Sequence, residues 1–399
     1  MKSDYKNIYG KFNGNEAEYA LRALDSETHE NKTFPWVQKL EETFASSIGS
    51  KYAIAVNSGT SGLHAALYAA GVGPGDEVIQ PSKTVVMDSY VTLHMGAVPI
   101  FADICPKSWN IDPIKIEEKI TEKTKAIIVV SLYGLPVDID PIMEIASKHN
   151  LIVIDDSAET LMTKYKDGFA GTHSDIAVYS FEKSKHMTSG SEGGMMITSD
   201  ESLAIRARKF AGIGYKGLTA DAGRTSLASS VYQDPDYERF DTIGFNYRMN
   251  AITAAIGLAQ FERIDFLVNR RKEIGKMFLD AVDGCDWIET QQIPSYSEHS
   301  YFTFGMLYQG ESILGISWKE FYELYKEMGG DGFYACWKPP YLEPSLRGKK
   351  IGNQLFEYGL CPIAEEYQKK IMAFKTNYRN LEEAKKQTKI LSKLIKEIS

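Results

Sequence analysis

The stretch of the sequence best suited to covalent chemistry is SFEKSKHMTSGSEGGMM, at residues 180–196. It places Lys183 and Lys185 just beyond a predicted strand and just before a glycine-rich segment. A lysine amine held in a dry pocket has a lowered pKa, which makes it a nucleophile for carbonyl groups. A lysine in a loop is more often solvated. A reactive lysine is therefore indicated only when this stretch is considered together with other stretches of the sequence.

Two further stretches carry groups that suit a bound ligand. NSGTSGLHAAL (57–67) lies between a predicted strand and a predicted helix, where small residues and free N–H groups favour a phosphate. It is neither GxGxxG nor Walker A, which counts against a dinucleotide or P-loop site, and a simple helix cap is the plainer interpretation. VIDDSAET (153–160) puts Asp155 and Asp156 at the end of a buried strand, where open α/β sheets bind ligands.

The two aspartates face opposite sides of an extended strand, so only one of them faces a given ligand. A helix cap explains Asp155 better than Asp156. In chain order, the three stretches supply a phosphate turn, an acid at a strand end and a lysine. These are the groups that hold pyridoxal 5′-phosphate: an anion cradle, a carboxylate for the ring nitrogen and an amine for the aldehyde.

Alternating apolar runs and helical patterns predict the elements that position these groups. Continuous apolar strands in a βαβ rhythm indicate a mostly parallel sheet covered on both faces. Strands are expected at 52–56, 76–81, 99–104, 126–134 and 151–158, a paired strand unit at 175–181 and 193–200, and helices at 61–71, 89–97, 114–124 and 139–150.

After residue 200 the pattern changes. Residues 212–243 are rich in loop-forming residues and too long for an idle connection, so this segment is expected to be functional or mobile. Residues 250–282 have helical periodicity over a length that can link two domains. We expect an N-terminal segment (1–35), a large domain (36–262) and a small C-terminal domain (263–399).

The composition excludes several classes of protein. The 399 residues are 43% hydrophobic and 25% charged, which is ordinary for a globular protein and unlike a disordered or fibrous one. A net charge of −8 argues against non-specific nucleic-acid binding. The four cysteines form no CxxC pair or zinc spacing, so we expect reduced thiols and no metal. Without a signal peptide or a membrane-length apolar run, a cytoplasmic location is expected.

In its motifs, the sequence resembles the DegT/DnrJ/EryC1/StrS sugar aminotransferases. These are fold type I pyridoxal-phosphate enzymes that mostly act on keto groups of nucleotide-linked sugars. The resemblance runs from about residue 34 to the C-terminal helix and implies an α/β fold. That fold has a large domain with a mixed, mostly parallel seven-stranded sheet flanked by helices, and a smaller C-terminal α/β domain. The shared motifs, in the family's order, are SGTSGLHAAL, PGDEVIQPSKT, VIDDSAE, SF….K….GSEGG, GFNYRMNAITAAIGLAQ and CPIAEEY.

The resemblance implies roles for individual residues. Lys185, five residues after the serine of SF, is the lysine that binds the cofactor covalently, and Asp156 pairs with the ring nitrogen. Lys183 lies at a position that varies within the family. Asn246 matches an asparagine that reaches the phosphate of the neighbouring subunit, which implies a homodimer, and Arg248 is a candidate for binding an anionic group of the substrate. The implied phosphate contacts within the chain are Ser58, Gly59, Thr60 and Ser180.

Two positions depart from the family's pattern. Glu159 stands where glutamine or histidine is commoner. Two acids near the ring raise the pKa of one of them, so Glu159 is expected to be protonated or turned toward a substrate hydroxyl. Val85 stands where an aromatic residue often stacks on the ring. A valine packs there without the stacking contribution, which should weaken cofactor binding without abolishing it.

The resemblance implies transfer of an amino group from glutamate to a nucleotide-linked or free keto-sugar. The product would be an amino sugar for a surface polysaccharide, such as lipopolysaccharide, or for an antibiotic. A branch of the family has histidine in place of the lysine and dehydrates the sugar; Lys185 favours amino transfer, and the neighbouring His186 receives no role. The alternatives are a sugar dehydratase, a non-catalytic regulator that keeps the fold, and a nucleotide-binding α/β protein without the cofactor.

Overall fold

The centre of the protein is a seven-stranded sheet with the strand order β1-β9-β8-β5-β4-β2-β3. Its strands are β1 (Tyr52–Val56), β2 (Glu77–Pro81), β3 (Val98–Ala102), β4 (Thr124–Val130), β5 (Ile152–Asp156), β8 (Ile176–Ser180) and β9 (Gly194–Thr198). Strand β9 is antiparallel to both of its neighbours, and the other six strands share one direction. The predicted mixed, mostly parallel sheet is confirmed. The computed structural model describes residues 10–28, 34–221, 223, 228–378 and 380–399.

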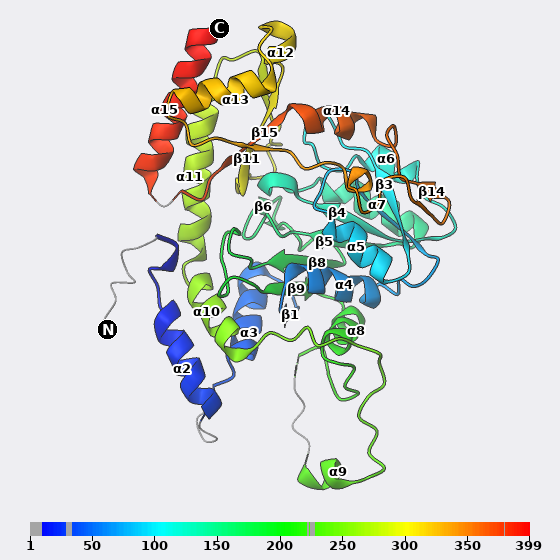
Figure 1. The fold of residues 1–399 in the computed structure, drawn as a ribbon. Helices are drawn as coiled ribbons and strands as arrows, with labels where there is room; N and C mark the ends of the chain where they lie inside the picture. The colour runs from blue at the N-terminus through cyan, green and yellow to red at the C-terminus, as the bar shows by residue number, and fades with distance from the viewer. Residues whose placement is uncertain (1–9, 29–33, 222, 224–227, 379) are drawn as a thin grey trace.

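Helices cover both faces of this sheet (Figure 1). They are α3 (Trp36–Ile48), α4 (Gly59–Ala69), α5 (Met87–His94), α6 (Pro113–Glu117), α7 (Ile139–His149), α8 (Glu201–Ala211) and α10 (Ala251–Phe261). Alternation along β1 shows why two layers form. Ile54 and Val56 pack with α4 and α8, whereas Ala53 and Ala55 pack with α3 and α10. Because both sets of side chains are buried, the strand reads as one apolar run.

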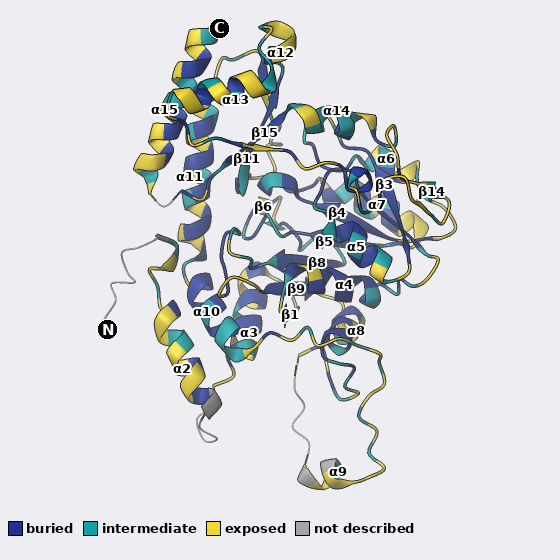
Figure 2. Ribbon diagram, viewed as in Figure 1, coloured by how far each residue is buried: buried dark blue, intermediate teal, exposed yellow. Residues whose placement is uncertain are grey.

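The C-terminal part begins with the long helix α11 (Ile264–Val282) and builds a second core around a four-stranded antiparallel sheet. The order of this sheet is β10-β11-β15-β12, with β10 (Ile288–Thr290), β11 (Thr303–Tyr308), β12 (Tyr334–Ala335) and β15 (Ile371–Lys375). The amphipathic helices α13 (Trp318–Glu327) and α15 (Leu381–Ile398) cover it, with their exposed faces toward solvent (Figure 2).

The remaining elements are short or peripheral. They are η1 (Gly10–Phe12), α2 (Glu16–Thr28), η2 (Leu132–Gly134), β6 (Lys164–Tyr165), β7 (Gly168–Phe169), α9 (Ser229–Gln233), α12 (Gly310–Ile313), η3 (Pro340–Leu342), β13 (Lys350–Ile351), β14 (Gln354–Leu355) and α14 (Pro362–Lys370). None of the helices in the described part of the chain has the length and apolarity that a bilayer crossing requires.

Three expectations about local structure need adjustment. The helix expected at 114–124 ends at Glu117, because hydrogen bonds between Thr121 and Thr124 form a turn that leads into β4. The helical pattern over 250–282 is divided between α10 and α11. The long segment 212–243 contains α9 and extends away from the body of the protein (Figure 1); its residues 222 and 224–227 lie outside the described part.

Candidate active site

Two adjoining cavities lie beyond the carboxyl ends of the parallel strands. We name them cavity A, of about 950 Å³, and cavity B, of about 560 Å³. Cavity A contains Ser58, Gly59, Thr60 and Ser180, whereas cavity B is lined on one side by the C-terminal part of the chain. Both cavities are lined by Thr84, Val85, Asp156, Ala158, Glu159, Ser184, Lys185, Phe302 and Trp337.

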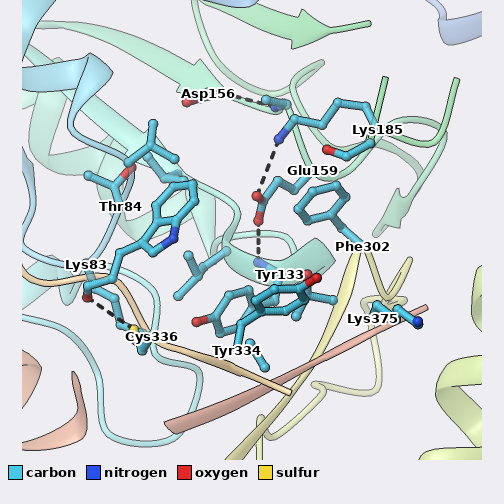
Figure 3. Close-up of a pocket in the computed structure, with 18 of the residues that line it drawn as sticks. Lys83, Thr84, Tyr133, Asp156, Glu159, Lys185, Phe302, Tyr334, Cys336 and Lys375 are labelled. Atoms are coloured by element: carbon cyan, nitrogen blue, oxygen red, sulfur yellow. Dashed lines mark hydrogen bonds and ion pairs between the residues drawn. The ribbon is translucent and has the colours of Figure 1, made fainter. Parts of the chain in front are cut away.

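Lys185 lies where the two cavities meet, in the loop that follows β8 (Figure 3). Its Nζ is 3.4 Å from Oε1 of Glu159 and 4.2 Å from the centre of the Phe302 ring. Lys183, two residues earlier, is exposed and lines neither cavity. Of the two lysines in the motif, only Lys185 therefore has its amine in the site.

The loop that carries Lys185 is fixed by two cations from distant segments. The carbonyl oxygen of Lys185 accepts hydrogen bonds from Nζ of Lys11, at 2.8 Å, and from Nη2 of Arg271, at 3.1 Å. Arg271, on α11, also donates to the carbonyl oxygens of Ser184 and Phe302. These bonds tie the loop to the N-terminal segment and to the C-terminal part.

Asp156 ends β5 and faces both cavities, whereas Asp155 lines neither. The prediction that only one of the pair faces a ligand agrees with this arrangement. Burial raises the pKa of Asp156 to about 6, against the opposing charge of Lys185. Its Oδ1 accepts a hydrogen bond from the backbone N–H of Ala158 at 3.1 Å. Burial raises the pKa of Asp155 to about 7.

A further buried acid, Asp88 on α5, lies near this group and carried no motif in the sequence. Its Oδ2 accepts a hydrogen bond from Oγ1 of Thr84 at 2.6 Å, and its Oδ1 has no partner. Complete burial and the nearby charge of Asp156 raise the pKa of Asp88 well above its usual value. Burial beside another carboxyl group thus disfavours the charged form of Asp88.

The turn at the start of α4 forms a cradle in cavity A. The side chain of Ser58 caps the helix by accepting from the N–H of Ser61 at 3.1 Å, as the plainer interpretation expected. The N–H groups of Gly59 and Thr60 follow and have no intrahelical acceptor. A Cβ atom on Gly59 would lie 3.0 Å from Cβ of Ser180. The absence of a side chain thus lets the helix start approach the end of β8.

Glu159 is held by two contacts rather than left free to turn. Its Oε2 accepts from the backbone N–H of Tyr133 at 2.8 Å, and its Oε1 faces Lys185. Tyr133 has a φ of 59°, a left-handed conformation that is uncommon for a bulky residue and concentrates at functional sites. The backbone there is arranged so that its N–H points at Glu159.

The structure brings together eight of the ten residues singled out in the sequence. Asn246 and Arg248 line neither cavity of their own chain, and both are exposed. Nε of Arg248 donates to Oδ1 of Asn246 at 3.1 Å. The buried His186 also lies outside both cavities, where burial lowers its pKa well below the usual value.

Sequence reasoning missed the residues that line cavity B from other segments. Lys83 lies within the shared motif PGDEVIQPSKT but received no role there. The others belong to no recognised motif and meet only through tertiary packing: Tyr133, Arg271, Phe302, Tyr334, Cys336, Trp337 and Lys375. The sequence does not single them out, whereas the structure shows that the large aromatic residues Trp337 and Tyr334 remain 64% and 68% exposed. Exposed aromatic residues beside a cavity suit a stacking contact with a ligand.

Comparisons with known proteins agree with this geometry. Residues 11–387 match the model of the DegT/DnrJ/EryC1/StrS aminotransferase family. GDP-perosamine synthase of Caulobacter vibrioides is 41% identical over 66% of this chain and 67% of its own length. Spore coat polysaccharide biosynthesis protein SpsC of Bacillus subtilis is 32% identical over 85% of this chain and 84% of its own length.

Among solved structures, an aminotransferase from Psychrobacter cryohalolentis superposes with a TM-score of 0.86 and 27% identity, covering 98% of this chain and 99% of that one. The match therefore includes both sheets of this chain. On these grounds the chain belongs to the DegT/DnrJ/EryC1/StrS aminotransferase family and is a pyridoxal-phosphate-dependent sugar aminotransferase.

Proposed function

We propose that the enzyme transfers an amino group from glutamate to a keto-sugar that is linked to a nucleoside diphosphate, with a GDP-sugar as the first candidate. The observation that carries the proposal is the meeting of Lys185 and Asp156 in one site beside the α4 cradle. The name of the Caulobacter relative, GDP-perosamine synthase, supports GDP as the carrier. The name of the Bacillus relative supports a role in making a surface polysaccharide.

The site fits pyridoxal phosphate. The cradle at Ser58, Gly59 and Thr60 presents the amide donors of Gly59 and Thr60 without intrahelical acceptors, which suits a phosphate, and Ser180 adds a hydroxyl. Val85 lines both cavities and provides an apolar contact for the ring. When bound, the cofactor supplies an electron sink that stabilises negative charge on the carbon bearing the amino group.

The chain's own residues supply the proton chemistry. Nζ of Lys185 acts as the base that removes a proton and as the acid that returns it one position further along, which general acid–base catalysis requires. With the cofactor bound, the carboxylate of Asp156 would hold a proton on its ring nitrogen. Glu159 lies 3.4 Å from the amine and orients it, while the Phe302 ring closes the other side.

We further propose that the enzyme works as a homodimer in the cytoplasm. Asn246 is exposed and lies outside the site of its own chain, which suits a role in the site of a partner. The segment that carries it also exposes large apolar side chains: Phe240, Ile243 at 92% and Phe245. Apolar groups this exposed are typical of an interface. The break between α10 and α11 supports the division into domains at residues 262 and 263.

The direct experiment incubates the purified enzyme with glutamate and a panel of GDP-, UDP- and dTDP-linked keto-sugars. Mass spectrometry should detect replacement of the keto oxygen by an amino group in one of them, and the Lys185→Ala variant should give none. Loss of water from the sugar without any amino donor would instead indicate a dehydratase. No change in any sugar, with cofactor bound, would favour the non-catalytic regulator.

A further inference from the structure

Cavity B contains a second buried lysine that the proposed mechanism does not use. Lys83 follows directly after β2, and it is only 5% exposed. Its Nζ contacts Sγ of Cys336 and lies 5.6 Å from the centre of the Tyr133 ring (Figure 3). Lys83 belongs to the large sheet and Cys336 to the C-terminal part, so this contact crosses the cavity.

The charge of Lys83 has no acidic partner. Within the part of the chain that the structure describes, no carboxylate oxygen lies within ion-pair distance of its Nζ. The nearby acids are already engaged: Glu159 faces Lys185, and Asp156 accepts from Ala158. A buried ammonium group without an opposite charge is costly, and the face of one aromatic ring offsets only part of that cost.

The other cations of cavity B are satisfied. Lys375 forms an ion pair with Asp331, and Arg271 donates to backbone carbonyl oxygens and to Oγ1 of Thr376. Lys185 faces Glu159. Among the described cations that line this cavity, Lys83 therefore differs in lacking both a carboxylate and a set of carbonyl acceptors.

The neighbouring hydroxyl group is also a donor. Burial, with the adjacent thiol of Cys336, raises the pKa of Tyr133 well above its usual value, so its hydroxyl stays protonated and can donate a hydrogen bond. The Lys83 amine and the Tyr133 phenol both contact Cys336, and the amine is 5.6 Å from the centre of the ring. An ammonium group and a phenol donor in one cavity wall match a ligand group that only accepts hydrogen bonds and carries negative charge. Carboxylates and phosphates are such groups.

We propose that Lys83 and Tyr133 form a subsite for an oxyanion of the substrate, so that Lys83 helps to select which molecules react at Lys185. The inference rests on the proposed function, because the oxyanion belongs to a molecule whose amino or keto carbon reaches Lys185. Two substrates of that reaction carry such a group. The amino donor has carboxylates, and the nucleotide sugar has phosphates.

The two half-reactions separate these sources, because an aminotransferase works by ping-pong kinetics. The first half-reaction, with glutamate alone, is followed by the change in cofactor absorbance. The second is followed by adding the nucleotide keto-sugar to the aminated enzyme. We expect Lys83→Met to raise the concentration for half-maximal rate by about 10- to 100-fold in one half-reaction only, as for loss of a hydrogen bond to a charged group. Lys83→Arg should retain most of the affinity.

Matched variants keep the test sharp. Tyr133→Phe keeps the backbone N–H that holds Glu159 and removes only the hydroxyl, so it should weaken the same half-reaction to a smaller extent. The control variant Lys386→Met, on the exposed face of α15, should change neither half-reaction. An equal effect of Lys83→Met on both half-reactions, or no effect on either, would overturn the proposal.

Binding of unreactive probes tests the subsite independently of catalysis. Glutarate, which has two carboxylates and no amine, and GDP are titrated against wild type and Lys83→Met by calorimetry. Weaker binding of one probe to Lys83→Met supports the subsite even if no sugar is aminated, in which case only the proposed function fails. The proposal would be overturned if both probes bound Lys83→Met as tightly as wild type and the Cys336 thiol became less reactive toward iodoacetamide in this variant. In that case a Cys336 thiolate balances the charge of Lys83, and there is no substrate subsite.

Discussion

Lys11 and Lys185 are 174 residues apart in the sequence, yet Nζ of Lys11 donates a hydrogen bond to the carbonyl oxygen of Lys185 at 2.8 Å. The same Nζ donates to the carbonyl oxygen of Lys183 at 2.6 Å. Lys11 is held in turn at its own carbonyl oxygen by Nε2 of Gln260 on α10. The start of the described chain thus positions the loop that carries Lys185, the proposed reactive amine.

Removing this contact should slow the reaction more than it weakens substrate binding. In Lys11→Met the loop loses two hydrogen bonds, and the amine of Lys185 is held less well. We expect kcat to fall several-fold, about 1 kcal/mol in the activation free energy, with KM little changed. Lys183→Met is the control, because its exposed side chain lies outside both cavities. Equal kinetics for the two variants would contradict the positioning role.

Lys11 also predicts a pH dependence of stability. Burial and the charge of Arg271 lower the pKa of Lys11 to about 7 from its ordinary value of 10.5. Between these two values the unfolded chain binds more protons than the folded one, so this group makes the free energy of unfolding rise with pH in that window. The free energies of unfolding of wild type and Lys11→Met, measured with urea, should therefore differ by an amount that changes across this pH window. A constant difference would contradict the depressed pKa.

Cofactor binding should weaken in acid because of Asp156. Its pKa is raised to about 6 by burial, so below that pH the folded apoenzyme carries a neutral carboxyl that cannot pair with a protonated ring nitrogen. The affinity for pyridoxal phosphate, measured by absorbance titration, should therefore fall as the pH drops through about 6. The Asp156→Asn variant should bind pyridoxal phosphate weakly at every pH, without a fall in affinity near pH 6.

Asp88 supplies the control for that experiment. Burial and the nearby charge of Asp156 raise the pKa of Asp88 well above its usual value, and Asp88→Asn should leave the fall in cofactor affinity near pH 6 in place. If the fall in cofactor affinity disappears in Asp88→Asn and persists in Asp156→Asn, the group that titrates is Asp88 and not Asp156, which contradicts the prediction.

Gly194 should be essential for the phosphate cradle. A Cβ atom there would lie 2.8 Å from the backbone N of Gly59 and from the backbone of Ser58, which has no room to yield. Gly194→Ala should displace the start of α4 and weaken cofactor affinity by at least about tenfold, and it should also lower stability by about 1–3 kcal/mol. Gly73→Ala, where the nearest atom is 4.0 Å away, is the matched control. Similar cofactor affinity in both variants would contradict this account of the cradle.

The proposed dimer predicts complementation between two inactive variants. Asn246→Ala should lack the phosphate contact that it supplies to its partner, and Lys185→Ala should lack the reactive amine. In a mixed dimer, the Asn246→Ala subunit keeps Lys185 and receives Asn246 from its partner, so one complete site forms. Mixing the two proteins under conditions of subunit exchange should restore part of the amino transfer. If the mixture stays inactive although mixed dimers are detected, Asn246 does not act across the interface.

The sheet could be predicted from the sequence because its strands are buried on both faces and read as continuous apolar runs. The meeting of Lys185, Asp156 and the cradle could be predicted for a related reason. Each lies at the end of such a strand or in the loop that follows it, and the carboxyl ends of parallel strands meet at one edge. The extent of the helix at 114–124 could not, because side-chain hydrogen bonds of Thr121 and Thr124 decide where it stops.

The rest of the site could not be predicted because it depends on packing between distant segments. Arg271 lies on an amphipathic helix and Lys11 in a polar stretch, and neither position marks a contact with Lys185. Asp88 resembles any polar residue of a surface helix until its complete burial is known. For Lys83, the informative fact is the absence of an acidic partner, which a sequence does not reveal.

The most direct test of the account is to reduce the holoenzyme with borohydride and to map the modified peptide by mass spectrometry. The account predicts a single reduced pyridoxyl group on Lys185, lost in Lys185→Ala and unaffected in Lys183→Met. A pyridoxyl group on Lys83 or Lys183, or an unmodified Lys185 peptide in enzyme saturated with cofactor, would contradict it.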